Sequence, residues 1–167
     1  MIGKYRFQKL LLAFGLSVAC APLWAATATT TFGVSGTIVS TCTVTAAALD
    51  FGATIPTPIN SNVDAASTVT ATCSNTTPYT IALNAGTGTG ATFAARKMTS
   101  GGNALTYSLF TDAGRTLVWG NGTAGSNLSN QTGTGTAQVI NVFGRIPTGQ
   151  TPPVGSYNDT ITVTVTF

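Results

Sequence analysis

Few side chains in this sequence could carry out acid–base or metal chemistry. The 167 residues include four acidic residues, all of them aspartate, and no histidine. General acid–base catalysis and metal binding would therefore depend on scattered carboxylates alone, at Asp50, Asp64, Asp112 and Asp159. A Ser-His-Asp or Cys-His arrangement is excluded because it needs a histidine. The sequence thus predicts a protein that is not an enzyme and that needs no cofactor or metal.

The glycine-rich string Gly120–Gly125 fits the dinucleotide-binding pattern G-x-G-x-x-G. That pattern binds a pyrophosphate only when a helix N-terminus follows it. Here turn-forming serine and asparagine residues follow, so we expect an ordinary loop. Just before this string, Trp119 could belong to a sugar-binding platform, but a single tryptophan more often fills a core.

The N-terminus has the pattern of a secretory signal peptide. Three basic residues, Lys4, Arg6 and Lys9, precede a short apolar run and a small-residue exit at Ala25. This predicts a leader of residues 1–25 that is cleaved after Ala25. Without it, four basic residues balance four aspartates, so the net charge falls from +3 to zero. An electrostatic affinity for nucleic acid or an anionic membrane is therefore not expected.

The three cysteines divide between the leader and the exported chain. Cys20 ends the apolar run and could be a lipoprotein acylation site, but the leucine expected three residues before it is a serine. The remaining pair is Cys42 and Cys73. Two cysteines in an exported chain without histidine or glutamate favour a disulfide over a metal site. Closing this loop of about 30 residues would stabilise the fold by about 3–4 kcal/mol.

The rest of the chain favours β-strands. All 33 threonines follow residue 26, and β-branched residues suit a sheet. No apolar period of 3.6 residues extends beyond about two turns, whereas period-two alternation recurs. Seven or eight short strands separated by turn residues predict one all-β domain, a β-sandwich. The expected strands are Phe32–Ile38, Leu49–Ile55, Thr68–Cys73, Tyr79–Asn84, Leu105–Phe110, Thr116–Trp119, Ala137–Phe143 and Thr160–Phe167.

Both ends of the exported chain indicate a sandwich that lacks a strand. The clearest strand pattern is the last, with one face made of Ile161, Val163, Val165 and Phe167. Near the other end, Phe32, Val34 and Ile38 alternate with polar or small residues although an Ala/Thr-rich segment precedes them. We expect this N-terminal segment to fill a gap in another chain by strand addition. The alternative is an ordinary edge strand within the same chain.

These residues resemble the spore coat protein U domain, the pilin type of archaic chaperone–usher pili. The resemblance covers the mature chain, and its strings are Thr41–Val44, Leu49–Gly52, Cys73, Leu105–Asp112, Val118–Gly120, Val142–Pro147 and Gly155–Phe167. Each string alone is weakly specific. Their order behind a signal peptide, with a last strand that ends in an aromatic residue, is more specific.

The resemblance implies an incomplete immunoglobulin-like pilus subunit, residues 26–167, with no catalysis. A periplasmic chaperone would lend it a strand, and an outer-membrane usher would exchange that strand for the donor segment, residues 26–37, of the next subunit. The apolar face of the last strand would border the groove and meet the chaperone. The product would be an extracellular polymer that supports adhesion or biofilm formation.

Two points about the donor segment stay open at this stage. Gly36 is either a close backbone approach or a hinge, and Ile38 belongs either to the donor segment or to the subunit's own first strand. The alternative function, from another class, is a secreted monomeric binding module such as a carbohydrate-binding adhesin or coat protein. A small exported hydrolase is disfavoured because the necessary side chains are absent.

Overall fold

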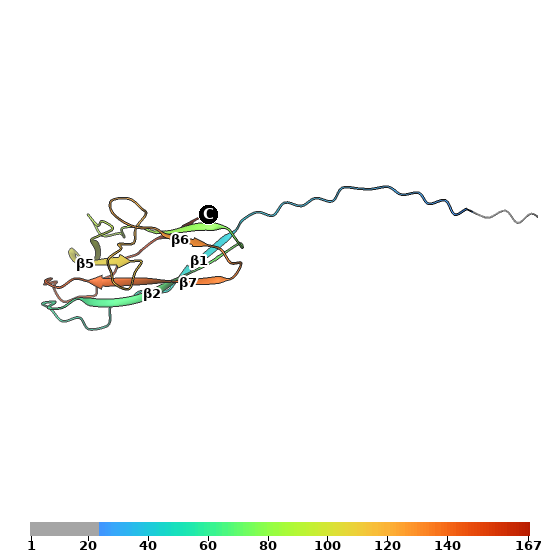
Figure 1. Cartoon of the computed structure of the whole chain (residues 1–167). Coiled ribbons are helices and arrows are strands. Elements are labelled where there is room, and N and C mark those ends of the chain that lie inside the picture. Colours follow the sequence, from blue (N-terminus) through green and yellow to red (C-terminus); the bar gives the residue numbers. More distant parts are fainter. Residues whose placement is uncertain (1–23) are drawn as a thin grey trace, which may run out of the picture. The chain divides into compact units, whose positions relative to one another are not determined.

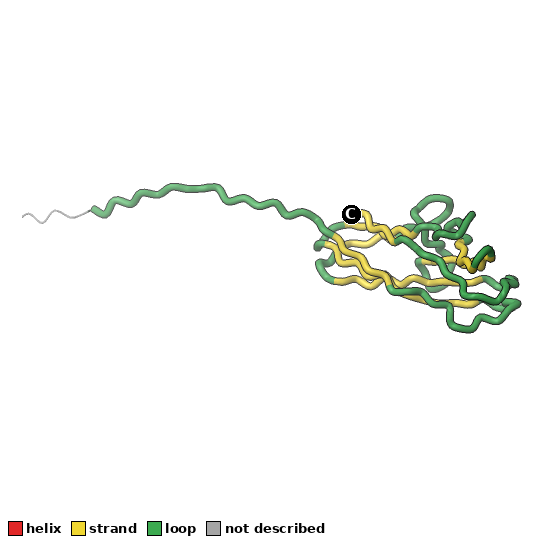
Figure 2. Tube along the Cα trace, turned by 180° about the vertical axis from the view of Figure 1, so that it is seen from behind, coloured by secondary structure: helices red, strands yellow, loops and turns green. Residues whose placement is uncertain are grey.

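A computed structural model describes residues 24–167. The expected leader falls almost entirely on residues 1–23, which lie outside the described residues, as does Cys20. The chain divides into two units, one up to Thr37 and one from Ile38 to Phe167. In the first unit, residues 24–37 contain no strand and are all exposed, and Figure 2 shows them as loop. The expected donor segment therefore has no ladder partner within this chain.

The second unit is built from eight strands, with no helix in residues 24–167. Accordingly, no helix of the described chain is long and apolar enough to cross a membrane. The strands are β1 (Cys42–Ala46), β2 (Val63–Cys73), β3 (Pro78–Leu83), β4 (Arg96–Ser100), β5 (Asn103–Phe110), β6 (Ser129–Thr132), β7 (Ala137–Ile146) and β8 (Val163–Thr166).

The strands form two sheets of unequal width. The wider sheet has the order β1-β2-β7-β5-β4, and the narrower one has the order β6-β3-β8. All strand pairs are antiparallel. Figure 1 shows β2 and β7 side by side in one layer and β6 in the other. The predicted all-β, immunoglobulin-like sandwich is confirmed.

The core lies between the two sheets and follows the period of two that strands impose. In β3, Tyr79, Ile81 and Leu83 are buried, whereas the residues between them are half-buried. The wider sheet contributes inward-facing side chains from its three middle strands: Val69, Ala71, Leu105, Tyr107, Leu109, Val142 and Ile146. The alternation visible in the sequence therefore identified the buried face of these strands.

Three expected strands are not strands in the structure. Residues 32–38 and 49–55 form no ladder, and in residues 116–119 only isolated bridges occur, at Val118 and Trp119. Alternation allows a strand, but a ladder also needs a neighbouring edge to pair with. Conversely, β1, β4 and β6 were not expected. The sequences of β4 and β6, RKMTS and SNQT, show no apolar alternation. They form because β5 and β3 offer edges to them.

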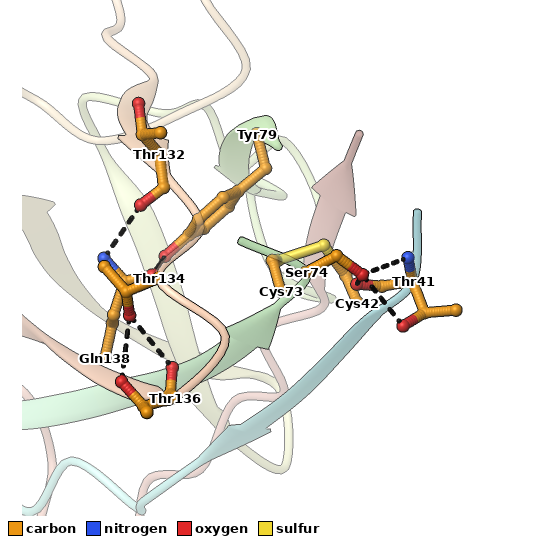
Figure 3. Close-up of a disulfide and its surroundings, with 9 residues drawn as sticks. All are labelled: Thr41, Cys42, Cys73, Ser74, Tyr79, Thr132, Thr134, Thr136 and Gln138. Atoms are coloured by element: carbon orange, nitrogen blue, oxygen red, sulfur yellow. Dashed lines mark hydrogen bonds between the residues drawn. A yellow bond between two sulfur atoms is a disulfide. The ribbon is translucent and has the colours of Figure 1, made fainter. Parts of the chain in front are cut away.

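A disulfide joins Cys42 to Cys73, as predicted. The two residues are register partners, at the start of β1 and at the end of β2. Beside them, the Thr41 N–H donates to the Ser74 hydroxyl (Figure 3). The Ser74 N–H in turn donates to the Thr41 carbonyl. Because β1 is an edge strand with one neighbour, the disulfide fastens this edge to β2, the longest of the eight strands.

The two sheets are linked near the disulfide by Gln138 on β7 (Figure 3). Its side-chain oxygen accepts a hydrogen bond from the Tyr79 hydroxyl at 3.3 Å. Its side-chain nitrogen donates to the Thr132 carbonyl at 3.1 Å. Burial raises the pKa of Tyr79, so its hydroxyl stays protonated at neutral pH and acts as the donor. This end of the sandwich is therefore held by both covalent and polar contacts.

Arg96 is the largest polar side chain in the core and is fully buried. Its guanidinium donates to three backbone carbonyls, those of Asn84, Phe93 and Trp119. Burial lowers its pKa to about 10, so it remains charged at neutral pH. Trp119 is also fully buried, and its indole N–H donates to Ile81. It fills the core, and the structure contradicts the idea of a sugar-binding platform at this residue.

Asp64 and Asp112 hold exposed parts of the fold in place. Asp64 on β2 accepts two hydrogen bonds from Arg145 on β7 and lies 3.3 Å from Arg115. The Arg145 hydrogen bond, assisted by Arg115, holds the pKa of Asp64 below its usual range despite an opposing effect of burial. Asp112 accepts the N–H groups of Leu117 and Thr116, which likewise lower its pKa.

We expect loss of the disulfide to destabilise the folded unit. Replacing Cys42 and Cys73 together by serine should lower the free energy of unfolding by about 3–4 kcal/mol, since the closed loop spans 31 residues. Urea unfolding of the chain from Ala26 onward, followed by Trp119 fluorescence, measures this change. Reduced wild-type chain is the matched control and should behave like the double variant. An unchanged urea midpoint would contradict the prediction.

Stability should be nearly independent of pH between about 5 and 8, because the chain has no histidine and no glutamate. It should fall below about pH 4. The folded pKa values of Asp64 and Asp112 are depressed, so the unfolded chain binds protons more readily, and stability is lost as these groups protonate. Urea midpoints at pH 3, 5 and 8 test this, and a transition between pH 5 and 8 would refute it.

Candidate functional site: a groove beside the β8 edge

A groove of about 1120 Å³ opens between the two sheets of the folded unit. Its floor is made by inward-facing side chains of the wider sheet, among them Val69, Leu105, Tyr107 and Val142. Two segments without strand structure, residues 47–55 and 152–161, supply its walls. The floor is apolar because these side chains belong to the core. The groove is thus a part of the core that no strand within residues 24–167 covers.

The first wall follows β1, and its apolar side chains turn inward. Its start is fixed by the Ala47 N–H, which donates to the Thr68 carbonyl, and by Ser67, whose hydroxyl donates to the Ala47 carbonyl. Further on, Leu49 and Phe51 lie over Gly144 of β7 so closely that an added Cβ there would lie 2.9–3.0 Å from both side chains. The expected strand at residues 49–55 is absent because this segment leaves the sheet edge to fill the interior.

The second wall connects β7 to β8 and lies against the edge of β4. Thr99 and Asn158 exchange backbone hydrogen bonds of 2.9 and 3.1 Å. The next residue, Asp159, accepts from the Thr87 N–H and hydroxyl, both at 2.8 Å, and from the Tyr107 hydroxyl at 2.7 Å. The chain then continues through Ile161 into β8. This wall therefore begins on the wider sheet and ends as the edge of the narrower one.

Asp159 is an ionised carboxylate at neutral pH. Burial alone would raise its pKa, but hydrogen bonds from the Thr87 backbone, the Tyr107 and Thr87 hydroxyls and the Thr160 backbone outweigh it and lower the pKa. Tyr107 has a raised pKa, first because of burial and second because of its bond to Asp159. Neither residue was expected from the sequence to be part of a site. The signal for Asp159 was the scarcity of carboxylates, because in a chain with only four of them each is a candidate for a structural role.

β8 is the free edge at this groove. It pairs with β3 on one side, and within residues 24–167 no strand pairs with its other side. Of the expected groove-lining residues, Ile161 and Val163 line the groove. Val165 is half-buried against the core, and Phe167 is 55% exposed. Neither is among the lining residues, and contact of this face with a chaperone stays a prediction.

The expected donor residues are among the most exposed apolar side chains described. Phe32 and Val34 are each 86% exposed and Ile38 is 99% exposed. Gly36 has no heavy atom within 4 Å of an added Cβ, so no contact in the described part of the chain requires glycine there. The unit boundary separates Ile38 from Phe32 and Val34. The role of these residues as a donor strand stays a prediction.

The other chemical motifs carry no site in the described part of the chain. The glycine-rich residues 120–125 form turns with no helix after them, as expected. Within residues 24–167, no three side chains of the metal-binding types cluster together. Asp50, which also lines the groove, accepts a hydrogen bond from the backbone of Gly52. The apolar floor of the groove is suited to holding an apolar chain segment.

Comparison with known proteins gives a family, a relative and a structural neighbour. The family model described as Spore Coat Protein U domain matches residues 28–164, so the match begins ahead of the folded unit. A curated relative, Protein U of Myxococcus xanthus, is 34% identical in an alignment of 164 residues that covers 90% of this chain and 90% of the relative.

The structural neighbour is a chain in the crystal structure of the CsuC–CsuE chaperone–tip adhesion subunit pre-assembly complex. That complex comes from archaic chaperone–usher Csu pili of Acinetobacter baumannii. The TM-score is 0.57 at 25% sequence identity, over 78% of this chain. The match spans 41% of the neighbour's own length. The sequence matches, which extend over most of this chain, agree with the resemblance seen in its motifs, and the chain belongs to the Spore Coat Protein U domain family.

Proposed function

We propose that this protein is a structural subunit of an extracellular pilus, assembled by strand exchange along a chaperone–usher route. A strand supplied by another chain enters the groove beside β8, and the segment of residues 26–37 enters the groove of a neighbouring subunit. The observation that carries the proposal is the combination of an uncovered apolar floor with a free strand edge in the same groove. The family membership and the pilus-complex neighbour support it.

The physical reason for strand addition lies in what the groove exposes. A free sheet edge presents unpaired N–H and C=O groups, and an uncovered apolar floor favours association with other chains. A strand added to β8 would satisfy the backbone groups and place alternate side chains over the floor. It would widen the narrower sheet to four strands, closer to the five that it faces.

The N-terminal segment has the composition of such a strand. Phe32, Val34 and Ile38 would each contribute about 1.5–3 kcal/mol when buried in a neighbour. Main-chain hydrogen bonds add to this, and the ordering of a free segment subtracts from it. The segment has no charged side chain between Ala26 and Thr37. No desolvation of a charged side chain therefore opposes its insertion.

A subunit with an open groove needs protection before assembly. We infer a periplasmic chaperone that lends a strand to the β8 edge and an outer-membrane usher that exchanges it for the donor segment. The assembled fibre would lie on the cell surface and support adhesion or biofilm formation. The balanced charge of the mature chain suits this purpose, because little self-repulsion opposes stacking.

Removal of the donor segment should separate chaperone binding from polymerisation. A chain that keeps its leader but lacks residues 26–37 should still be recovered with its chaperone and should be absent from fibres. The groove remains, but the strand for the next subunit is gone. Immunoblots of sheared surface fibres and of chaperone pull-downs measure the two properties. Normal incorporation of the shortened chain into fibres would contradict strand donation by this segment.

Single substitutions in the segment give a sharper test. Val34→Asp should abolish the multimer ladder that the chain from Ala26 onward forms on an unheated denaturing gel, since it places a charge on the apolar floor. Ser35→Asp is the matched control, because period two directs residue 35 away from the floor, and it should keep most of the ladder. Equal loss in both variants would argue against a strand. A soluble wild-type monomer without any ladder would favour the alternative, a secreted binding module.

A further inference from the structure

One buried side chain contacts both walls of the groove. Tyr107 on β5 is 4% exposed and forms part of the groove floor. Its ring packs edge-to-face on Phe51 of the first wall, with centroids 6.0 Å apart and an interplanar angle of 70°. Its hydroxyl donates to Asp159 of the second wall at 2.7 Å. Through this one residue, the two wall segments have fixed positions relative to the floor.

The second wall depends on Asp159 for its attachment. Besides Tyr107, the carboxylate accepts two hydrogen bonds from Thr87 in the loop between β3 and β4. That loop approaches so closely that a Cβ at Gly86, whose φ is +86°, would collide with the carboxylate. Asp159 also precedes Thr160 and Ile161, which lead directly into β8. The position of this carboxylate therefore influences where the free edge starts.

In the described part of the chain, no cationic side chain forms an ion pair with Asp159. Arg96 is the register partner of Tyr107 across β4 and β5, yet its guanidinium is occupied by the carbonyls of Asn84, Phe93 and Trp119. Among the described residues, the only ion pairs involve Asp64. Besides the backbone pair of Thr99 and Asn158, the second wall is joined to a floor side chain by the hydrogen bond from Tyr107, which is charge-assisted and of the stronger kind.

From this arrangement we propose that Tyr107 is a positioning residue that holds the groove at the width an incoming β-strand requires. The proposal rests on the proposed function and adds the residue that prepares the site. Binding a strand costs free energy for ordering the surfaces that receive it, and walls that are already in place reduce this cost. Tyr107 performs this through Phe51 on one side and Asp159 on the other.

Tyr79 is a matched control within the same fold. It is 2% exposed and also donates its hydroxyl to one side chain, Gln138. It lies near the disulfide (Figure 3) and is not among the residues that line the groove. Replacing either tyrosine by phenylalanine removes one hydroxyl from a buried site. A purely structural role would lower the free energy of unfolding at both positions, more at Tyr107 with its charge-assisted bond, but would leave peptide binding similar in the two variants.

The test measures capture of a donor strand by the chain from Ala26 onward. A fluorescent synthetic peptide of residues 26–39 is titrated into Val34→Asp chain, whose own segment is not expected to occupy a neighbour's groove. In that background, Tyr107→Phe should weaken peptide binding about tenfold, and Tyr79→Phe should change it less than twofold. Backbone amides of residues 155–161 should exchange hydrogen faster in Tyr107→Phe and at the original rate in Tyr79→Phe.

A second variant tests whether Tyr107 acts through Asp159. Asp159→Asn keeps an acceptor oxygen but loses the charge, and its combination with Tyr107→Phe closes a double-mutant cycle. If the two residues act through one link, the double variant should bind the peptide as tightly as the single variant with the lower affinity. Losses of binding free energy that add fully in the double variant would overturn the proposed link. Equal peptide affinity of the Val34→Asp chain with and without Tyr107→Phe would also overturn it. A Val34→Asp chain that captures no peptide at all would instead refute the proposed function.

Discussion

The difference in width between the two sheets is the constraint on which the rest of this structure depends. Five strands on one side present an apolar inner face, and three strands on the other cannot cover it. Part of the difference is filled by Leu49 and Phe51, which fold over Gly144. The remainder is the groove beside β8. Within the described residues this imbalance leaves part of the core uncovered, and for this reason we propose that a strand from another chain completes it.

The few charged groups of residues 26–167 hold paired strands and loops of the fold in place. Asp64 joins β2 to β7 through Arg145, Asp112 orders the turn that follows β5, and Asp159 attaches the second wall. Arg96 binds the carbonyls of loops that would otherwise be buried without donors. With these groups engaged in structure, the groove offers an apolar floor and a backbone edge. The strand addition that we propose would therefore depend on shape and main-chain hydrogen bonds.

The sequence predicted the central strands well and the peripheral ones poorly. Thr68–Cys73, Tyr79–Asn84, Leu105–Phe110 and Ala137–Phe143 all fall on strands, because each packs one face on the core and therefore alternates. Residues 49–55 also alternate, yet their apolar side chains fill space between the sheets instead of joining a ladder. β4 and β6 carry little apolar character and exist because a neighbouring edge is available. Edge pairing is a long-range property that a local pattern does not contain.

Composition and local pattern were sufficient for the exclusion of histidine-based catalysis, the period-two core faces, the pairing of Cys42 with Cys73 and the family resemblance. These follow from residue types and short-range order, which are written in the chain itself. Only the tertiary structure decided that the sheets differ in width and that Trp119 is buried. It alone brought Tyr107 into contact with Phe51 and Asp159, residues 56 and 52 positions away. Such contacts depend on how strands pair across the whole chain, and no local period encodes that pairing.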